Sequence, residues 1–332
     1  MRRVDHDAAP RTARRQGEIE QAAAERGESG HGRLSPRRTA RTSPAMSSSP
    51  EIFDRALRRL RRDRAARMPA EDFVRAHIAA ELIERLELVK RAFTRALDLG
   101  SSDDSIAAPL AARGIEVTRA DAGPVNAARG GGQPWDEDCM PLAEASFDLV
   151  VWAGGMDQVN DLPGALIQIR RVLRPDGLFI AGLVGAGSLP RLRAAMHAAD
   201  MAGPGGAASP RLHPQIDVRA MGDLLQRAGF ALPVADGESL DVRYRSLAGL
   251  VADIRAAGAA NALIQRSRRA LTRLQAGAAF AAFQDEAEPD GRVRERLELI
   301  YCLGWAPDES QPKPARRGSA VRSLADELKG RG

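Results

Sequence analysis

SFDLVVWAGGMDQVNDLPGALIQIRRVLRPDGLFIAGLV, residues 146–184, is a complete strand–helix–turn–strand unit. Residues 147–152 are an apolar run of strand length, and residues 162–173 repeat their apolar side chains at helical spacing. An Arg-Pro-Asp-Gly turn at 174–177 stops the helix, and residues 178–184 are a second apolar run. Two nearly continuous apolar strands joined by a crossover helix predict an α/β fold whose parallel sheet is covered on both faces.

This unit resembles class I S-adenosylmethionine-dependent methyltransferases. In that class an acid leads into one strand, as Asp148 does here, and a Pro-Asp-Gly turn leads into the next. The resemblance implies a Rossmann-like, doubly wound sheet of seven strands with an antiparallel last strand and a helical insertion. The other strands are expected at residues 93–99, 115–121, 130–135, 231–244 and 294–304, and further helices at 188–202 and 217–228.

Composition divides the chain into segments. Residues 1–49 are rich in Arg, Ser, Gly, Pro and Glu and cannot bury enough apolar surface to offset their chain entropy, so we expect a disordered tail. The remaining segments are N-terminal helices at 50–92, a methyltransferase-like core at 93–246 and 290–305, a helical insertion at 247–289, and a Pro- and charge-rich tail at 306–332.

The first helix, expected at 51–67, is basic and amphipathic, and a second is expected at 71–90. Side chains near one face of the first helix are Ile52, Phe53, Ala56, Leu57 and Leu60. Such a helix is typical of a membrane surface. Because the apolar stripe is short, we favour packing as a lid over the core.

The net charge of +5 raises the question of nucleic acid. No Lys precedes Lys90, so the positive charge is mainly Arg, which is typical of coding composition as well as of binding surfaces. Nucleic-acid binding usually combines a basic stripe with aromatic stacking platforms, and no such interleaving is present. We expect no nucleic-acid partner.

Compartment is indicated by three features. No run approaches the roughly 18 apolar residues of a membrane span, and two cysteines, Cys139 and Cys302, suit a reducing compartment. The Arg- and Ser-rich start is similar to a mitochondrial presequence, but its acids favour a tail or an over-long gene start. We expect a cytoplasmic bacterial protein, peripheral to the inner membrane where it attaches, or a matrix protein in a eukaryote.

The methyltransferase resemblance assigns a cofactor site for S-adenosylmethionine. Asp98 and Gly100 end the first core strand, where the class carries an acidic-x-Gly-x-Gly-x-Gly loop that binds the methionine portion. Ser102 and Asp104 stand in place of the second and third glycines, and Asp104 adds a negative charge near the expected cofactor carboxylate. The alternative is a strand-to-helix turn without a ligand.

Two further acidic positions complete this predicted site. Asp121 ends the second strand, where an acid of the class accepts hydrogen bonds from both ribose hydroxyls, although a strand-end Asp is also a common turn former. Asp136 and Glu137 match the acidic loop that reads the adenine, or are a solvated loop. The predicted cofactor residues are therefore Asp98, Gly100, Ser102, Asp121, Asp136 and Glu137.

Catalytic residues are not identified by any pattern. Asp157 and Gln158 follow the fourth strand beside the expected substrate space, and Asn160 and Asp161 are typical of a helix cap. The histidines lack paired helical spacing and a His-x-Asp/Glu pattern, and no Ser/His or Cys/His arrangement occurs, so we expect no metal site.

Further motifs resemble the mitochondrial complex I assembly factor 5 family and its relative, the malonyl-carrier-protein methyltransferase of biotin synthesis. They are Ile52–Arg55, Val159–Pro163, Leu173–Gly177, Leu224–Phe230, Gly304–Trp305, and the stretch from Glu309 to Ala320. The mitochondrial member is described as an arginine hydroxylase acting on a complex I subunit. The sequence departs from this family where Asp157-Gln158 replaces a His or Gln followed by Trp.

The resemblance leaves several functions open. The first is a methyltransferase that binds S-adenosylmethionine and acts, by transferase chemistry or in complex assembly, on a protein substrate such as a complex I subunit. The others are a non-catalytic assembly factor with a degenerate pocket, a malonyl-carrier-protein O-methyltransferase, and arginine hydroxylation. The sequence sets neither the acceptor nor the oligomeric state.

Overall fold

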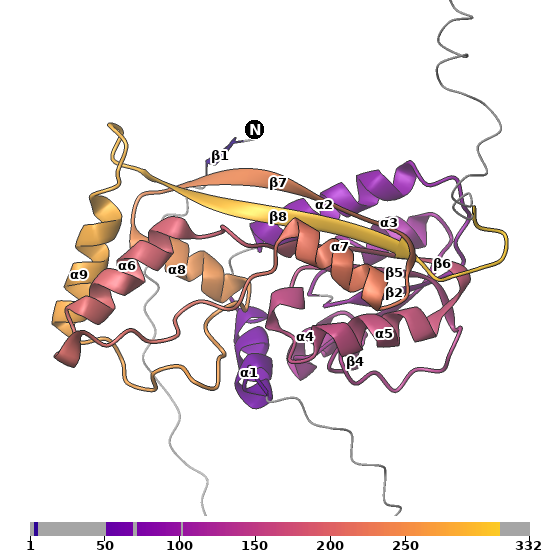
Figure 1. The fold of residues 1–332 in the computed structure, drawn as a ribbon, viewed down its shortest axis with the longest axis horizontal. Coiled ribbons are helices and arrows are strands. Elements are labelled where there is room, and N and C mark those ends of the chain that lie inside the picture. Colours follow the sequence, from indigo (N-terminus) through magenta and orange to yellow (C-terminus); the bar gives the residue numbers. More distant parts are fainter. Residues whose placement is uncertain (1–2, 6–50, 69–71, 101, 313–332) are drawn as a thin grey trace, which may run out of the picture.

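The computed structural model describes residues 3–5, 51–68, 72–100 and 102–312. One eight-stranded sheet, in the order β1-β7-β8-β6-β5-β2-β3-β4, runs through the molecule with helices on both faces (Figure 1). The strands are β1 Arg3–Asp5, β2 Arg95–Leu99, β3 Glu116–Asp121, β4 Gln133–Pro134, β5 Phe147–Ala153, β6 Leu173–Val184, β7 Ala231–Tyr244 and β8 Val293–Trp305. Only β8 is reversed among them: it pairs antiparallel with both β6 and β7, and the other pairs are parallel.

Nine α-helices and two short 3-10 turns connect the strands within the described residues. The helices are α1 Arg55–Ala65, α2 Phe73–Glu87, α3 Ala107–Ala112, α4 Pro124–Arg129, α5 Leu162–Val172, α6 Pro190–Met201, α7 Val218–Arg227, α8 Leu247–Ala256 and α9 Arg273–Gln284, with 3-10 turns η1 Met156–Gln158 and η2 Pro204–Gly206. The crossover helix α5 begins after Asp161, whose side chain accepts the N–H of Gly164 at 2.8 Å.

The core consists of two layers, one on each face of the sheet. Side chains alternate along a strand, so Leu149 and Val151 of β5 pack with α2 and α3, while Val150 and Trp152 pack with α5 and α7. Residues of α6, α8 and α9 join the layer that holds Leu149. The strand β5 is buried along its whole length, as the apolar run predicted.

Asp148 ties the start of β5 to the start of β2. Its carboxylate accepts the backbone N–H groups of Thr94 and Arg95, each at 2.9 Å, and the Thr94 hydroxyl at 2.6 Å. These bonds use the acid as a clamp between neighbouring strands, which gives a structural reason for an acid at this position.

The predicted α/β architecture is confirmed, including the reversed last strand and the crossover unit. The weak strand expected at 130–135 contracts to Gln133–Pro134, and β6 begins at Leu173, before the Pro-Asp-Gly turn. The insertion holds two helices, α8 and α9, and Figure 1 shows α9 beside α6 at the end of the molecule away from the parallel strands.

The predicted tails are described only in part. Residues 3–5 were expected to be disordered and instead form β1, which pairs parallel with β7. The other residues of the expected 1–49 tail lie outside the described part of the chain, as do residues 313–332 of the C-terminal tail.

The lid helix α1 packs on the core through α4 and α8, and of the expected apolar stripe only Phe53, just before the helix, is fully buried. Ile52 and Leu60 are 44% and 43% exposed, whereas Arg58 and Arg62 are buried. The expectation that the apolar side chains face the core is therefore wrong for these two residues, because acids on the core attract the arginine face. Across the described helices, none combines the length and apolarity that crossing a bilayer requires.

Candidate functional site

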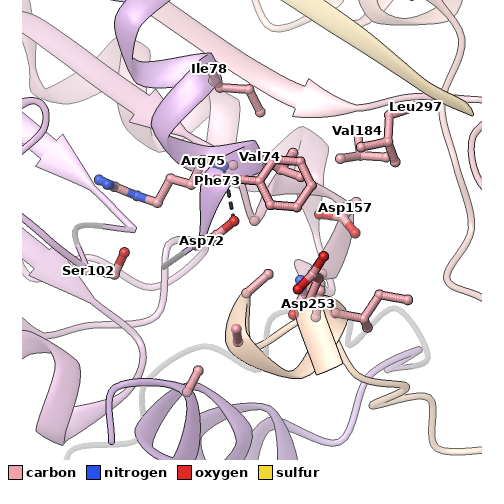
Figure 2. A pocket seen from close by; sticks show the side chains of 18 of the residues that line it. Asp72, Phe73, Val74, Arg75, Ile78, Ser102, Asp157, Val184, Asp253 and Leu297 are labelled. Atoms are coloured by element: carbon pink, nitrogen blue, oxygen red, sulfur yellow. Dashed lines mark hydrogen bonds between the residues drawn. The ribbon is translucent and has the colours of Figure 1, made fainter. Parts of the chain in front are cut away.

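A cavity of about 510 Å³ lies at the carboxyl ends of the parallel strands. Gly100 after β2, Gly154 after β5 and Val184 of β6 line its floor, while α1, α2 and α8 contribute walls. Figure 2 shows Phe73 of α2 among the lining side chains, with Ser102 on one side and Asp157 and Asp253 on the other. Ligands of doubly wound folds bind at this edge of the sheet.

The predicted glycine loop lies at the cavity. Gly100 has a φ of +66°, and a Cβ there would stand 3.3 Å from Nε1 of buried Trp152, so a side chain would be both strained and crowded. Ser102 lines the cavity. Asp104 does not line the cavity. Its side chain is 78% exposed and accepts a hydrogen bond from Nη1 of Arg119 at 2.7 Å. The expectation that Asp104 places a negative charge in the cofactor space is therefore wrong.

Asp98 is not among the residues that line the cavity, although it comes two positions before Gly100, which does. Its side chain is fully buried, with Nη2 of Arg75 at 3.9 Å and Nε of Arg119 at 4.0 Å. The carboxylate is thus flanked by two cations at the end of β2.

Asp121 is enclosed by α1. Nε of Arg62 lies 2.9 and 3.0 Å from its two carboxylate oxygens, Nη2 of Arg62 also donates to it, and the backbone N–H of Gly123 donates at 2.7 Å. Nη2 of Arg62 further lies 3.3 Å from the carbonyl oxygen of Gly100. The guanidinium therefore spans the crevice between the tips of β2 and β3.

The acidic loop after β4 meets three more arginines of α1. Arg58 binds Glu137 and Arg55 binds Asp138, each through two bonds of 2.7 Å. Arg59 donates to Asp136. We call Arg55, Arg58, Arg59 and Arg62 the arginine ladder; these positions i, i+3, i+4 and i+7 lie on one face of the helix.

Electrostatics favours the charged form of these pairs. Burial alone would raise the pKa of Asp138, but the hydrogen bonds and charge of Arg55 outweigh burial and hold the pKa below its usual value. Burial likewise opposes the charged form of Arg58, yet the charge and hydrogen bonds of Glu137 raise its pKa above the ordinary value. The ladder is therefore a row of ion pairs rather than neutral contacts.

The site fits S-adenosylmethionine at one end only. Gly100, Gly154 and Gly155 keep the cavity open beside Ser102, which suits the methionine portion. Carboxylates suited to ribose and adenine are present, but Asp121 and Glu137 are held by Arg62 and Arg58. With α1 seated, the nucleoside end does not fit.

A second polar group stands on the opposite wall. Nε2 of His213 accepts the backbone N–H of Ala262 at 3.2 Å, which places the ring proton on Nδ1, 3.4 Å from the carboxylate of Asp157. The Tyr244 hydroxyl is hydrogen-bonded to Asp253. Burial is the main cause that raises the pKa of this phenol, and the charge and hydrogen bond of Asp253 raise it further. Glu295 is completely buried, and burial raises its pKa although backbone N–H groups donate to it.

Sequence reasoning missed several lining residues. The Asn126 side chain was not considered, although its Oδ1 is buried without a hydrogen-bond partner among the described residues. The sequence did indicate Gln158, and its Oε1 is likewise buried without a hydrogen-bond partner among the described residues. His213, Asp253 and Glu295 come from segments far apart in sequence. The arginine spacing of α1 facing three consecutive acids was the one signal that could have indicated the ladder.

Three ligand-type side chains also meet outside the cavity. The ligand atoms of His77 and Glu81 on α2 and Glu238 on β7 lie within 4.8 Å of one another. Nε2 of His77 stands 3.2 Å from Glu238. No linear motif indicated this group, because Glu238 joins it through the sheet.

Comparison with known proteins identifies relatives over most of the chain. A family model described as "Methyltransferase domain" matches residues 97–181. Arginine-hydroxylase NDUFAF5 of Danio rerio is 33% identical over 83% of this chain and 89% of its own length. Malonyl-[acyl-carrier protein] O-methyltransferase of Laribacter hongkongensis is 33% identical over 77% of this chain and 87% of its own length. Among solved structures, the YcgJ protein of Bacillus subtilis aligns with a TM-score of 0.47 at 16% identity, over 70% of this chain and 99% of its own.

The family model and the two sequence relatives confirm the resemblance that the strand, turn and terminal motifs predicted. The chain belongs to the S-adenosylmethionine-dependent methyltransferase family that includes arginine-hydroxylase NDUFAF5 and the malonyl-[acyl-carrier protein] O-methyltransferases.

Proposed function

We propose that this protein binds S-adenosylmethionine at the carboxyl edge of its sheet and acts on a cationic side chain of a protein substrate during assembly of respiratory complex I. Asp98, Gly100, Ser102, Asp121, Asp136 and Glu137 are the proposed cofactor residues. We place the protein in the bacterial cytoplasm at the inner membrane, or in the matrix of a eukaryote.

The acidic lining of the cavity carries the proposal. Asp157 and Asp253 line the wall opposite Ser102, and Glu295 also lines the cavity. Three of the four lining arginines are matched by acids: Arg62 by Asp121, Arg75 by Asp103 and Arg211 by Asp200. The fourth, Arg129, donates to the carbonyl oxygen of Ala66. The lining carboxylates of Asp157 and Asp253 outnumber this one cation, so an ammonium or guanidinium group is favoured there.

The same lining disfavours the malonyl alternative. A malonyl thioester presents a carboxylate, and carboxylates near Asp157 and Asp253 would repel it. Because the family also contains malonyl-carrier-protein enzymes, O-methylation of a malonyl carrier protein is the second candidate function.

The non-catalytic alternative draws on the arginine ladder. Arg62 and Arg58 hold acids that a nucleoside would need, which is the arrangement of a degenerate pocket. The open glycine end and the buried acceptors of Asn126 and Gln158 in the cavity support a binding site instead.

Deletion of the gene in its source organism tests the proposal. We expect a loss of assembled complex I on native gels and of NADH:quinone oxidoreductase activity, restored by the wild-type gene and not by Asp157→Asn/Asp253→Asn. A biotin requirement with normal complex I would favour the malonyl enzyme. Rescue by the double variant at wild-type protein level would favour the non-catalytic factor.

A further inference from the structure

Arg62 stands where the nucleoside of a bound cofactor would lie. Its guanidinium contacts Asp121 at the tip of β3 and the carbonyl of Gly100 at the tip of β2, and its Nη1 lies 3.6 Å from the position of a Cβ at Gly155. The side chain is buried, and it lines the cavity from within this crevice. A ribose that bonded to Asp121 would need the same volume.

The rest of the ladder covers the adenine side in the same manner. Arg58 occupies both oxygens of Glu137 and Arg55 both oxygens of Asp138. A carboxylate whose oxygens are bound in a bidentate pair has few lone pairs left for an exocyclic amine. Steric and hydrogen-bonding conflicts therefore arise at every acid that the nucleoside is proposed to use.

Attachment of α1 at its start is independent of the ladder. Oδ1 of Asn160 accepts the backbone N–H groups of Ile52 and Phe53 at 2.8 and 2.7 Å, and the N–H of Asp54 donates to the carbonyl of Ala262 at 2.9 Å. These bonds retain the segment before α1 when the ladder opens, which keeps the arginines at high effective concentration.

The net free energy of the ion pairs in the ladder is small enough for α1 to detach reversibly. Taking a guanidinium and a carboxylate out of water costs nearly as much as their attraction returns, so a buried ion pair contributes little net stability. Releasing α1 rehydrates the two buried arginines, Arg58 and Arg62, while a nucleoside satisfies their acids, so the exchange is close to balanced.

We propose that α1 is a displaceable plug whose arginine ladder and the nucleoside of S-adenosylmethionine compete for the same carboxylates, so that cofactor binding requires α1 to leave its seat. This inference rests on the proposed binding of S-adenosylmethionine.

A reversible covalent lock tests it. A Cβ at Gly258 would lie 3.5 Å from the Cβ of Ala65 at the end of α1, within the range of about 3.5–4.5 Å that a disulfide requires. The variant Ala65→Cys/Gly258→Cys is made in a Cys139→Ser background, because Cys139 is exposed. Cys302 is buried, and burial raises its pKa to about 12, so it stays unreactive.

Calorimetric titration with S-adenosylmethionine then compares the oxidised and reduced forms of one preparation. We expect the reduced form to bind and the oxidised form to bind at least about tenfold more weakly, which corresponds to about 1.4 kcal/mol. Equal affinity of the two forms overturns the plug. Far-ultraviolet circular dichroism checks that both forms are folded.

A second variant keeps the test independent of the disulfide. Arg58→Ala/Arg62→Ala removes the competitor, so its affinity for S-adenosylmethionine should exceed that of the wild type. Arg64→Ala, on an exposed position of the same helix, is the matched control and should leave affinity unchanged. Weaker binding by the double variant would make the ladder part of the cofactor site and overturn the plug.

The proposed function fails in a different way. If no form binds, including the double variant that lacks Arg58 and Arg62, then binding of S-adenosylmethionine is refuted and the plug falls with it. If every form binds with the same affinity, the cofactor proposal stands and only the plug is refuted.

Discussion

Arg62 holds Asp121 across 59 residues of sequence, through Nε bonds of 2.9 and 3.0 Å to the two carboxylate oxygens. Both side chains are buried, so neither charge can be satisfied by water when the other is removed. This pair connects the N-terminal lid to the sheet at the strand end where the fold places its ligand site.

Removal of one partner should therefore be costly. We expect Asp121→Ala to lower the free energy of unfolding by about 3–5 kcal/mol, because it leaves the Arg62 guanidinium buried and unpaired. Urea denaturation followed by circular dichroism measures this loss. Arg59→Ala is the control: the Arg59 side chain is 46% exposed, so its pair with Asp136 should be worth less than about 1 kcal/mol. Similar losses for the two variants would contradict a buried, ordered ladder.

Asp148 should be a stability residue rather than a functional one. Its three accepted hydrogen bonds hold the start of β2, and Asp148→Ala would leave two backbone N–H groups without acceptors. We expect a loss of about 3 kcal/mol of unfolding free energy. Asp104→Ala, at an exposed acid, should change stability by less than about 0.5 kcal/mol. A neutral Asp148→Ala would mean that the clamp is unimportant.

Alanine substitutions at two glycines with the same φ can separate the cost of backbone strain from the cost of crowding beside the cavity. Gly100 and Gly131 both have a φ of +66°, but a Cβ at Gly100 meets Trp152 at 3.3 Å and a Cβ at Gly131 meets nothing within 4 Å. Alanine in the left-handed region costs about 1–2 kcal/mol at either position. Thermal or urea unfolding should show Gly100→Ala losing about 1 kcal/mol more than Gly131→Ala. Equal losses would remove crowding as the reason for glycine at the strand end.

The fold was predictable because its signals are local. The apolar runs of β5 and β6 and the period of α5 each reflect burial within one short segment. The Pro-Asp-Gly turn was a less exact marker, because β6 already begins at Leu173 and Asp176, with a φ of 57°, lies within that strand. The strand at 133–134 was poorly predicted because it is two residues long and follows directly on the glycines at 130–132.

The candidate site was less predictable because its geometry depends on distant segments. Hydrophobic periodicity indicated a lid at 51–67, but which face of α1 is buried depends on Asp136, Glu137 and Asp138, some 80 residues later. Asp121 lies at a strand end as predicted, yet its partner is an arginine of that lid. Sequence spacing identified the acids, but the prediction did not pair them with the arginines of α1.

The stability of the lid should depend on pH through Asp138. Arg55 keeps the folded-state pKa of this carboxyl below the ordinary 3.8 in spite of burial. The unfolded chain therefore binds the proton first as pH falls, so the stability from this pair is complete above about pH 3.8 and is lost through the lowered folded pKa. Urea unfolding of wild type and Asp138→Asn between pH 7 and pH 3 should show a gap that shrinks at the acid end. A gap that grows there would contradict the ion pair.

Charge selection by the cavity should be measurable with a peptide pair. An arginine-containing peptide and its citrulline counterpart have nearly the same shape, but only arginine carries a charge for Asp157 and Asp253 to attract. We expect the arginine peptide to bind about tenfold more tightly, since a hydrogen bond to a charged group contributes about 1.5–3 kcal/mol. Fluorescence anisotropy of labelled peptides measures both affinities. The ratio of the two affinities should fall towards one in Asp157→Asn/Asp253→Asn. Asp104→Asn should leave this ratio unchanged, because Asp104 lies outside the cavity. A preference that survives loss of both carboxylates would place the recognition of the cation elsewhere on the protein.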